Sequence, residues 1–207
     1  MSGSLFVVSA PSGAGKTSLI KALRTELQEN VAVAVSHTTR PRRASEKDGD
    51  SYYFVDKTAF KELIDADMFI EYAQVFGHYY GTSRQTISEQ IARGKDMILE
   101  IDWQGALQVR KLYPQAKLIF ILPPSLTTLE QRLRNRATDD ERSMQKRLAG
   151  ALTEIAQYRH YDYLIINDDF HRALDQLKTI LLSCRLLRDR QECRSRKLIQ
   201  ELETAGC

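Results

Sequence analysis

One short segment combines glycines, a lysine and a threonine in an order that suits phosphate binding. It reads Ala10-Pro11-Ser12-Gly13-Ala14-Gly15-Lys16-Thr17. Glycines let the backbone turn its N–H groups toward a diphosphate, where a Cβ atom would obstruct the approach. The lysine brings a mobile positive charge to the β- and γ-phosphates, and the threonine hydroxyl can complete the shell of a bridging Mg²⁺ ion. Ser12 can add a further donor. We therefore predict that residues 10–17 hold the phosphates of a donor nucleotide.

The elements on either side of this loop fit that chemistry. Leu5–Ser9 is rich in β-branched residues and predicts a strand, whereas Lys16–Gln28 has the apolar spacing of an amphipathic helix. The N-terminus of such a helix directs its dipole at a bound anion. Ala10 replaces the first glycine of the strict motif G-x-x-x-x-G-K-[ST], which requires a negative φ at this position. No G-x-G-x-x-G follows a strand, so dinucleotide binding is disfavoured.

Arginines gather in two separate groups, although the net charge is only +3 and the pI is about 8.7. That balance is too mild to predict nucleic-acid binding. In the first group, Arg40 and Arg43 can each offer a planar fork to a phosphate, and Tyr52 and Tyr80 can donate hydroxyls to the same dianion. Core packing remains an alternative for either tyrosine. The second group consists of Arg132, Arg134, Arg136, Arg142, Lys146 and Arg147.

The rest of the chain alternates short apolar runs with longer amphipathic stretches, which predicts an α/β fold with a parallel sheet flanked by helices on both faces. The further predicted strands are Val31–Ser36, Met97–Ile101, Lys117–Leu122 and Tyr163–Ile166. The further predicted helices are Ser83–Arg93, Gln104–Lys111, Ser125–Arg134, Asp139–Tyr158 and one long helix over His171–Gln200.

Two segments interrupt this alternation. Residues 37–82 are rich in Arg, Tyr, Gly and Asp and predict a small inserted lobe with short strands of its own. Residues from about 124 to 148 are rich in arginine and form a second excursion. Residues 1–36 and 83–207, which include this second excursion, would form the core domain.

Composition places the chain among ordinary globular proteins. Its 207 residues are 43% hydrophobic and 28% charged, without an apolar run that could span a bilayer and without a signal-peptide pattern. We therefore expect a cytoplasmic protein with no membrane partner. The cysteines form no CxxC pair and predict reduced thiols rather than a disulfide framework or a zinc site. They are Cys184, Cys193 and Cys207.

A resemblance to a known family rests on several strings in order, from about residue 4 to residue 185. The strings include SHTTRPRR at 36–43, GDSYYF at 49–54, FIE at 69–71, GHYYGT at 77–82, IDWQG at 101–105, ILPPS at 121–125 and INDD at 166–169. With these strings and the phosphate loop, the chain resembles guanylate kinases of the bacterial type, within the P-loop nucleoside monophosphate kinases. This resemblance implies a P-loop kinase three-layer fold with an inserted NMP-binding lobe and a small lid at about 124–148.

The resemblance assigns an acceptor site for GMP. Glu71 would read the base, because one carboxylate can accept from the adjacent N1–H and N2–H donors of guanine, while adenine offers a lone pair at N1. Asp102 would contact either Mg²⁺-bound water or the sugar and base of the acceptor. The phosphate of GMP would be held by Arg40, Arg43, Tyr52 and Tyr80, and the region around O6 by Ser36 and Thr82.

The resemblance also assigns a lid and a donor border. Arg136 and Arg147 would face the transferring phosphoryl group, whose charge develops during the reaction. Asn167 would border the donor adenine, although a turn or cap role is an alternative. Three positions depart from the family pattern: Glu100 replaces Asp, and Asn135 and Ala137 replace the glycines beside the first lid arginine. The residues with catalytic roles would be Lys16, Arg40, Arg136 and Arg147.

These observations predict Mg²⁺-dependent, in-line phosphoryl transfer from ATP to GMP, and also to dGMP, without a covalent enzyme intermediate. One alternative is a nucleoside monophosphate kinase with another base specificity. Another is a non-catalytic guanylate-kinase-like binding module, although such modules typically have degraded phosphate loops. The sequence leaves a homodimer open and predicts no nucleic-acid partner.

Overall fold

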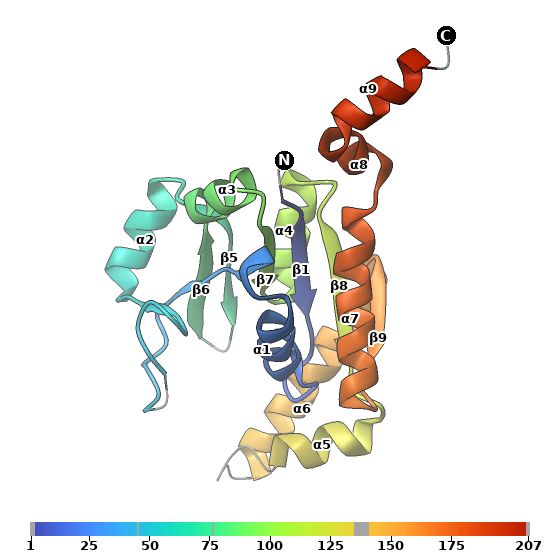
Figure 1. Ribbon diagram of the computed structural model, residues 1–207. Coiled ribbons are helices and arrows are strands. Elements are labelled where there is room, and N and C mark those ends of the chain that lie inside the picture. The colour runs from blue at the N-terminus through green and yellow to red at the C-terminus, as the bar shows by residue number, and fades with distance from the viewer. Residues whose placement is uncertain (1–2, 45, 76, 135–140, 206–207) are drawn as a thin grey trace.

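The computed structural model describes residues 3–44, 46–75, 77–134 and 141–205. Within these ranges the main sheet has five parallel strands in the order β2-β7-β1-β8-β9 (Figure 1). The phosphate loop follows β1 at the centre of the sheet. The strands are β1 (Leu5–Ser9), β2 (Val31–Val33), β7 (Asp96–Glu100), β8 (Lys117–Leu122) and β9 (Tyr163–Ile166).

Helices cover both faces of this sheet, which confirms the predicted α/β class. Phe6 and Val8 of β1 pack toward α1 (Lys16–Leu27) and α7 (Phe170–Arg185). Leu5 and Val7 belong to the opposite apolar cluster, which includes residues of α3 (Arg84–Ala92) and α4 (Trp103–Leu112). Alternate residues of one strand thus reach opposite cores, as the period of two requires.

A second sheet lies beside the main one and has the order β4-β3-β6-β5 in the described chain (Figure 1). Its elements are β3 (His37–Thr38), β4 (Tyr53–Phe54), the helix α2 (Lys57–Asp65), β5 (Phe69–Val75) and β6 (His78–Ser83). Gln108 of α4 joins the two parts, since its amide accepts from the N–H of Tyr72 at 3.1 Å and donates to the carbonyl of Tyr72 at 2.7 Å. The edge strand β5 is therefore held against α4 through its own backbone.

Two helices lie beneath the carboxyl end of β1 in Figure 1. They are α5 (Leu126–Arg134) and α6 (Glu141–Ile155), and a 3₁₀ turn at Ala156–His160 follows α6. Leu129 and Leu133 of α5 form a small apolar cluster with Ala151 of α6. The predicted lid residues Asn135, Arg136 and Ala137 lie outside the described residues.

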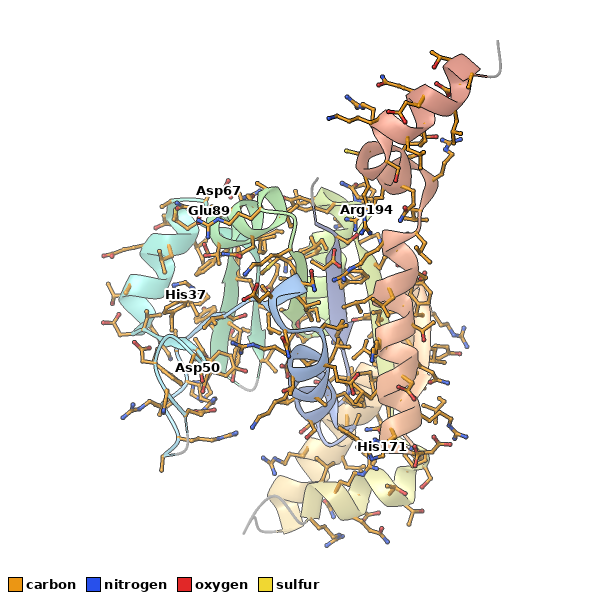
Figure 2. The ribbon with its side chains drawn as sticks, in the orientation of Figure 1. His37, Asp50, Asp67, Glu89, His171 and Arg194 are labelled. Carbon is orange, nitrogen blue, oxygen red and sulfur yellow. The ribbon has the colours of Figure 1, made fainter. Side chains whose placement is uncertain are left out.

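The predicted single helix over His171–Gln200 is wrong. The chain forms α7, α8 (Arg188–Arg194) and α9 (Arg196–Ala205), and α9 projects away from the two sheets (Figure 1). His171 lies near the start of α7 and Arg194 beyond its other end (Figure 2). The break comes at Leu187, whose φ of −55° and ψ of 137° are not helical. Two hydrogen bonds hold Arg185, the last residue of α7. Its guanidinium donates to Asp96 at 2.7 Å, and its carbonyl accepts from the side-chain amide of Gln191, in α8, at 2.9 Å. We attribute the end of α7 at this residue to these contacts.

Two further sequence expectations can be compared with the described residues. Cys184 and Cys193 are both free thiols there, as predicted. None of the helices in the described ranges combines the length and the apolar character needed to cross a membrane.

Candidate active site

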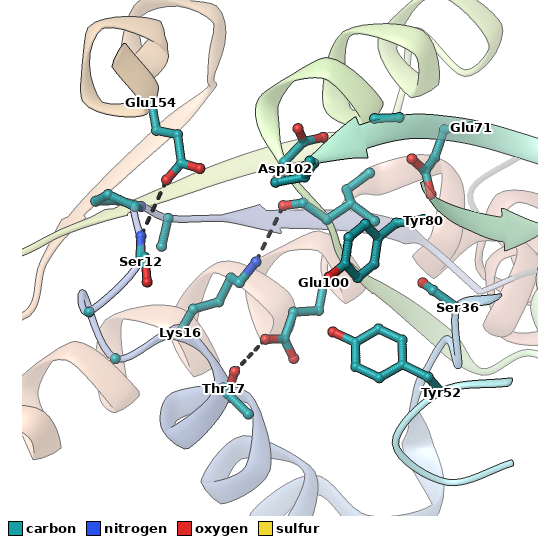
Figure 3. A pocket seen from close by; sticks show the side chains of 17 residues that line it. Ser12, Lys16, Thr17, Ser36, Tyr52, Glu71, Tyr80, Glu100, Asp102 and Glu154 are labelled. Atoms are coloured by element: carbon teal, nitrogen blue, oxygen red, sulfur yellow. Dashed lines mark hydrogen bonds between the residues drawn. The ribbon is translucent and has the colours of Figure 1, made fainter. Parts of the chain in front are cut away.

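One cleft of about 270 Å³ brings together the phosphate loop, the carboxyl end of β7 and the second sheet (Figure 3). Its loop side contains Ala10, Pro11, Ser12, Gly13, Gly15, Lys16 and Thr17. Its other side contains five of the residues predicted for the acceptor, namely Ser36, Tyr52, Glu71, Tyr80 and Asp102.

The loop has the backbone that its sequence requires. Gly13 and Gly15 have φ values of 91° and 95°, in the region where a side chain is strained. Among the described residues, the non-glycine residues with positive φ are Gln28 and Asp67, so Ala10 meets the condition for replacing a glycine. Lys16 extends along the cleft, and its Nζ donates to the carbonyl of Ile101 at 3.4 Å (Figure 3).

Asn167 supports the loop from behind. Its buried amide donates to the carbonyl of Ala14 at 2.7 Å. A Cβ added to Gly15 would lie 2.4 Å from the same amide nitrogen, so this glycine is needed for close packing as well as for its φ. Arg132 reaches the Asn167 carbonyl at 3.5 Å. The predicted contact of Asn167 with adenine stays a prediction, whereas its support of the loop was not anticipated.

Thr17 and Glu100 form an oxygen pair at the mouth of the loop. The Thr17 hydroxyl donates to Glu100 Oε1 at 2.5 Å (Figure 3). A hydroxyl and a carboxylate of this kind fit Mg²⁺, which is usually bound through one or two carboxylates together with waters and substrate phosphates. The described residues contain no cluster of three or more His, Cys, Asp or Glu that could hold a metal by themselves.

Asp102 begins α4 as well as lining the cleft. Its Oδ1 accepts from the N–H of Gly105 at 3.0 Å, and its Oδ2 accepts from the Gln104 amide at 3.0 Å. Oδ1 therefore caps the N-terminus of α4, while Oδ2 is engaged by a side chain of the first turn. The predicted Mg²⁺ contact through water stays a prediction, and Glu100 rather than Asp102 makes the direct bond to Thr17.

Glu71 is held in a buried hydroxyl network. It faces Thr82 across β5 and β6 in the strand register, and the Thr82 hydroxyl donates to Glu71 Oε1 at 2.5 Å. Ser36 Oγ lies 2.9 Å from Thr82 Oγ1. All three side chains are buried. Burial raises the pKa of Glu71 to about 7, although the Thr82 hydrogen bond acts in the opposite direction.

The two tyrosines predicted for the acceptor phosphate also come together. The rings of Tyr52 and Tyr80 meet edge to face at 5.9 Å between centroids, and the Arg40 guanidinium lies 5.5 Å from the Tyr52 ring centre. Burial raises the pKa of Tyr52 to about 12, so its hydroxyl remains a donor at neutral pH. Arg40 is engaged with Glu46 at 2.6 Å, a partner that the sequence did not indicate.

Of the predicted arginines that the structure describes, Arg40, Arg43 and Arg147 do not line the cleft. Arg43 is exposed, and its backbone N–H donates to Glu46 at 2.9 Å. Arg147 lies half-buried on α6 and does not line the cleft. Arg136 lies outside the described residues.

Two carboxylates line the cleft without a predicted role. Glu100 could have been assigned from its place at the end of a strand beside the loop, but its length relative to Asp left it without one. Glu154, from α6, accepts from the Ser12 N–H at 3.2 Å (Figure 3). In the sequence Glu154 is one polar residue within an amphipathic helix, so no local signal could have revealed it.

Comparison with known proteins agrees with this geometry. The family model described as guanylate kinase matches residues 2–184. The chain is 52% identical over 204 residues to the guanylate kinase of Acinetobacter baylyi, covering 99% of this chain and 98% of that one. It is also 52% identical over 201 residues to the guanylate kinase of Escherichia coli strain K12, covering 97% of each chain.

A solved structure shows the same relationship in three dimensions. The crystal structure of guanylate kinase from Anaplasma phagocytophilum superposes with a TM-score of 0.75 at 34% identity, covering 91% of this chain and 89% of that one. This similarity supports the predicted P-loop kinase fold. With a family model that matches most of its length and relatives that match it almost end to end, the chain belongs to the guanylate kinase family.

Proposed function

We propose that this protein transfers the γ-phosphoryl group of ATP to GMP, and also to dGMP, giving ADP and GDP or dGDP. One observation carries the proposal furthest: Glu71, which accepts from the buried Thr82 hydroxyl, lines the same cleft as the phosphate loop. Glu71 as a guanine reader and the loop as a triphosphate site would then lie at the two ends of one cleft. The names of the relatives support the same reaction.

The donor side is proposed to act by positioning. The loop N–H groups and the dipole of α1 would hold the β- and γ-phosphates. Lys16 would stabilise the negative charge that develops on the phosphate oxygens during transfer. The Ala10–Thr17 loop would bind ATP, with Asn167 beside the adenine as well as behind the loop.

The acceptor side is proposed to hold GMP by both of its ends. Glu71 would accept from N1–H and N2–H, with Ser36 and Thr82 near O6 and Asp102 beside the base or sugar. Tyr52 and Tyr80 would donate to the acceptor phosphate. Arg40 would bind the same phosphate by exchanging its bond with Glu46, and Arg43 would join from the adjacent segment.

Mg²⁺ is part of the proposal. Thr17 and Glu100 would hold it, with Asp102 contacting it through water. When bound, the ion would neutralise charge on the donor phosphates. The charge of the cleft supports this role, because Lys16 is accompanied by Glu71, Glu100, Asp102 and Glu154. Such an excess of carboxylates would repel two nucleotide anions unless a cation were bound between them.

The division of the chain into a lobe, a core and a lid is also part of the proposal. Residues 37–82 would form the GMP-binding lobe, residues 1–36 and 83–207 the core, and residues from about 124 to 148 the lid. Lid closure would bring Arg136 and Arg147 to the transferring group and exclude water. The reaction would be direct and in line. We retain the expectations of a cytoplasmic location and no nucleic-acid partner, and a homodimer stays open.

The two alternatives are less well supported. A binding module without catalysis does not explain why Lys16 and Thr17 are both kept in the cleft. A kinase for another base does not explain Glu71, whose carboxylate would face the N1 lone pair of adenine.

Product analysis tests the proposed reaction. Purified protein with ATP, Mg²⁺ and GMP should give ADP and GDP in equal amounts, resolved by ion-exchange chromatography. Lys16→Ala should reduce turnover by roughly a thousandfold or more, because it removes a charge that follows the transition state. GMP binding, measured by calorimetry, should change little in this variant. If the Lys16→Ala variant kept its turnover but lost GMP binding, the assignment of the loop to ATP and of the Glu71 end to GMP would be refuted.

A further inference from the structure

Glu154 makes a contact that the proposed reaction does not explain. It comes from α6, and its Oε2 accepts from the backbone N–H of Ser12 at 3.2 Å, across 142 residues of sequence (Figure 3). A helix of the lid region is thereby joined directly to the loop that would hold the donor phosphates.

The position of Glu154 on α6 means that its bond to Ser12 aligns α6 with the phosphate loop. Ala151 of α6, with Leu148 and Ile155 beside it, packs against α5. Arg147 lies seven residues before Glu154, which is two helical turns, so both are on the same side of α6. A hydrogen bond between Glu154 and the loop therefore also restricts the position of Arg147 relative to the loop.

The loop is also fixed on this side by packing. A Cβ added to Gly13 would lie 3.1 Å from a methyl group of Leu129, so the loop already touches α5. The bond to Ser12 adds a directional contact from the neighbouring helix. A backbone N–H in this partly buried position needs an acceptor, and Glu154 supplies it.

The charge of Glu154 argues that the contact is not incidental. Burial raises the pKa of the Glu154 carboxyl, while the positive charge of Lys16 lowers it. Any phosphate bound in the loop would repel a carboxylate here. An acidic residue placed at a phosphate site is unfavourable for binding unless its geometry contributes something else.

We propose that Glu154 is a positioning residue for phosphoryl transfer. Its hydrogen bond to Ser12 fixes α6, and with it Arg147, relative to the donor phosphates. The inference rests on the proposed function. It requires the reach of a Glu side chain and an accepting oxygen, but not the negative charge.

Three substitutions separate these requirements. Glu154→Gln keeps the reach and an accepting oxygen, Glu154→Asp keeps the charge but shortens the reach, and Glu154→Ala removes both. Thr153→Ala is the matched control, since Thr153 is the exposed neighbour on the same helix. Thermal unfolding of each variant shows whether the helix remains folded.

The inference predicts a split between kinetic constants. Glu154→Ala and Glu154→Asp should lower kcat roughly tenfold, the effect of leaving one N–H without its partner. Their KM for GMP should stay within about twofold of the wild-type value, because the acceptor site is not touched. Glu154→Gln and Thr153→Ala should keep kcat within about threefold.

Amide hydrogen exchange gives a readout that does not depend on activity. The peptide containing Ser12 should exchange faster in Glu154→Ala and Glu154→Asp than in the wild type and Glu154→Gln. Two results would overturn the inference: a Gln variant as impaired as the Ala variant, or unchanged exchange and kcat in the Ala variant. A wild-type protein that does not phosphorylate GMP would refute the proposed function instead, and the exchange data would still decide on Glu154.

Discussion

Glu71 illustrates how much a single side chain depends on its neighbours. Alone in the sequence it would be taken for a surface carboxylate, yet it is buried and bonded to the Thr82 hydroxyl at 2.5 Å. The strand register and a β-bulge between Phe69 and Glu71 turn it into the cleft. Family resemblance identified Glu71, but the buried network around it follows from the pairing of β5 with β6.

The raised pKa of Glu71 predicts a pH-dependent acceptor affinity. Since its pKa is about 7, the carboxylate that would accept from guanine forms as the pH rises through neutrality. The KM for GMP should therefore fall between pH 6 and pH 8. Glu71→Gln should raise this KM roughly a hundredfold, because the amide lacks one acceptor and the charge, and should remove the trend that depends on Glu71.

Steady-state kinetics at several pH values measure this effect, with the exposed Glu62→Gln as control. An identical pH trend in wild type and Glu71→Gln would contradict it. The stability of the fold should change with pH in the opposite direction to the affinity for GMP. The folded state keeps the Glu71 carboxyl protonated up to about pH 7, whereas the ordinary pKa of this group is 4.5. The contribution of Glu71 to the free energy of unfolding should therefore decrease as the pH rises from about 4.5 to 7.

Gly105 leads to a second prediction at the residue scale. A Cβ at this position would lie 2.3 Å from Glu71 Oε2. Gly105→Ala should displace the carboxylate and raise the KM for GMP roughly tenfold, with the KM for ATP unchanged. Helix propensity alone would favour Ala by about 1 kcal/mol, so lost stability should not be the cause. Kinetics of this variant beside Lys111→Ala, on the same helix, provide the check. An unchanged KM for GMP would contradict the prediction, because the Glu71 carboxylate would then move aside without any effect on GMP.

At the scale of elements, the sequence predicted most of the main sheet. Leu5–Ser9, Lys117–Leu122 and Tyr163–Ile166 are strands with the predicted bounds. Continuous apolar runs mark β1 and β8 because these strands are buried on both faces, whereas Leu164 and Ile166 of the edge strand β9 are exposed. The strands at 37–38 and 53–54 are too short to produce a period. The break after α7 was missed because it depends on Asp96, which is about 90 residues away in sequence.

Asp96 anchors that break and predicts a marked effect on stability. Its side chain is 2% exposed, and it accepts from the Ser4 N–H at 2.8 Å and from Arg185 at 2.7 Å. Asp96→Ala should cost about 3 kcal/mol, because it leaves buried donors and a charged partner without an acceptor. For a chain of this size that lowers Tm by roughly 9 °C.

Asp189→Ala is the matched control. Asp189 also pairs with an arginine, Arg188, at 2.9 Å, but both side chains are more than four-fifths exposed. Its removal should leave Tm unchanged. Calorimetry of the two variants compares them directly, and equal shifts in Tm would contradict the argument from burial.

At the scale of the whole molecule, two sheets meet at one cleft. The phosphate loop follows the central strand of one sheet, and Glu71, the proposed base reader, lies on the other, with α4 and Gln108 between them. The sequence predicted most of the residues that line the two ends of the cleft, but it assigned no role to the carboxylates Glu100 and Glu154, whose contacts are with elements distant in sequence. The selectivity of the protein therefore depends on the arrangement of two parts.

The central claim is that this arrangement selects guanine. A coupled assay that offers GMP, AMP, UMP and dTMP at equal concentration, with ATP and Mg²⁺, measures it most directly. The account predicts that kcat/KM for GMP exceeds that for each of the other three by roughly a hundredfold or more, because a mismatched base leaves Glu71 unpaired. Comparable values for all four acceptors would contradict it.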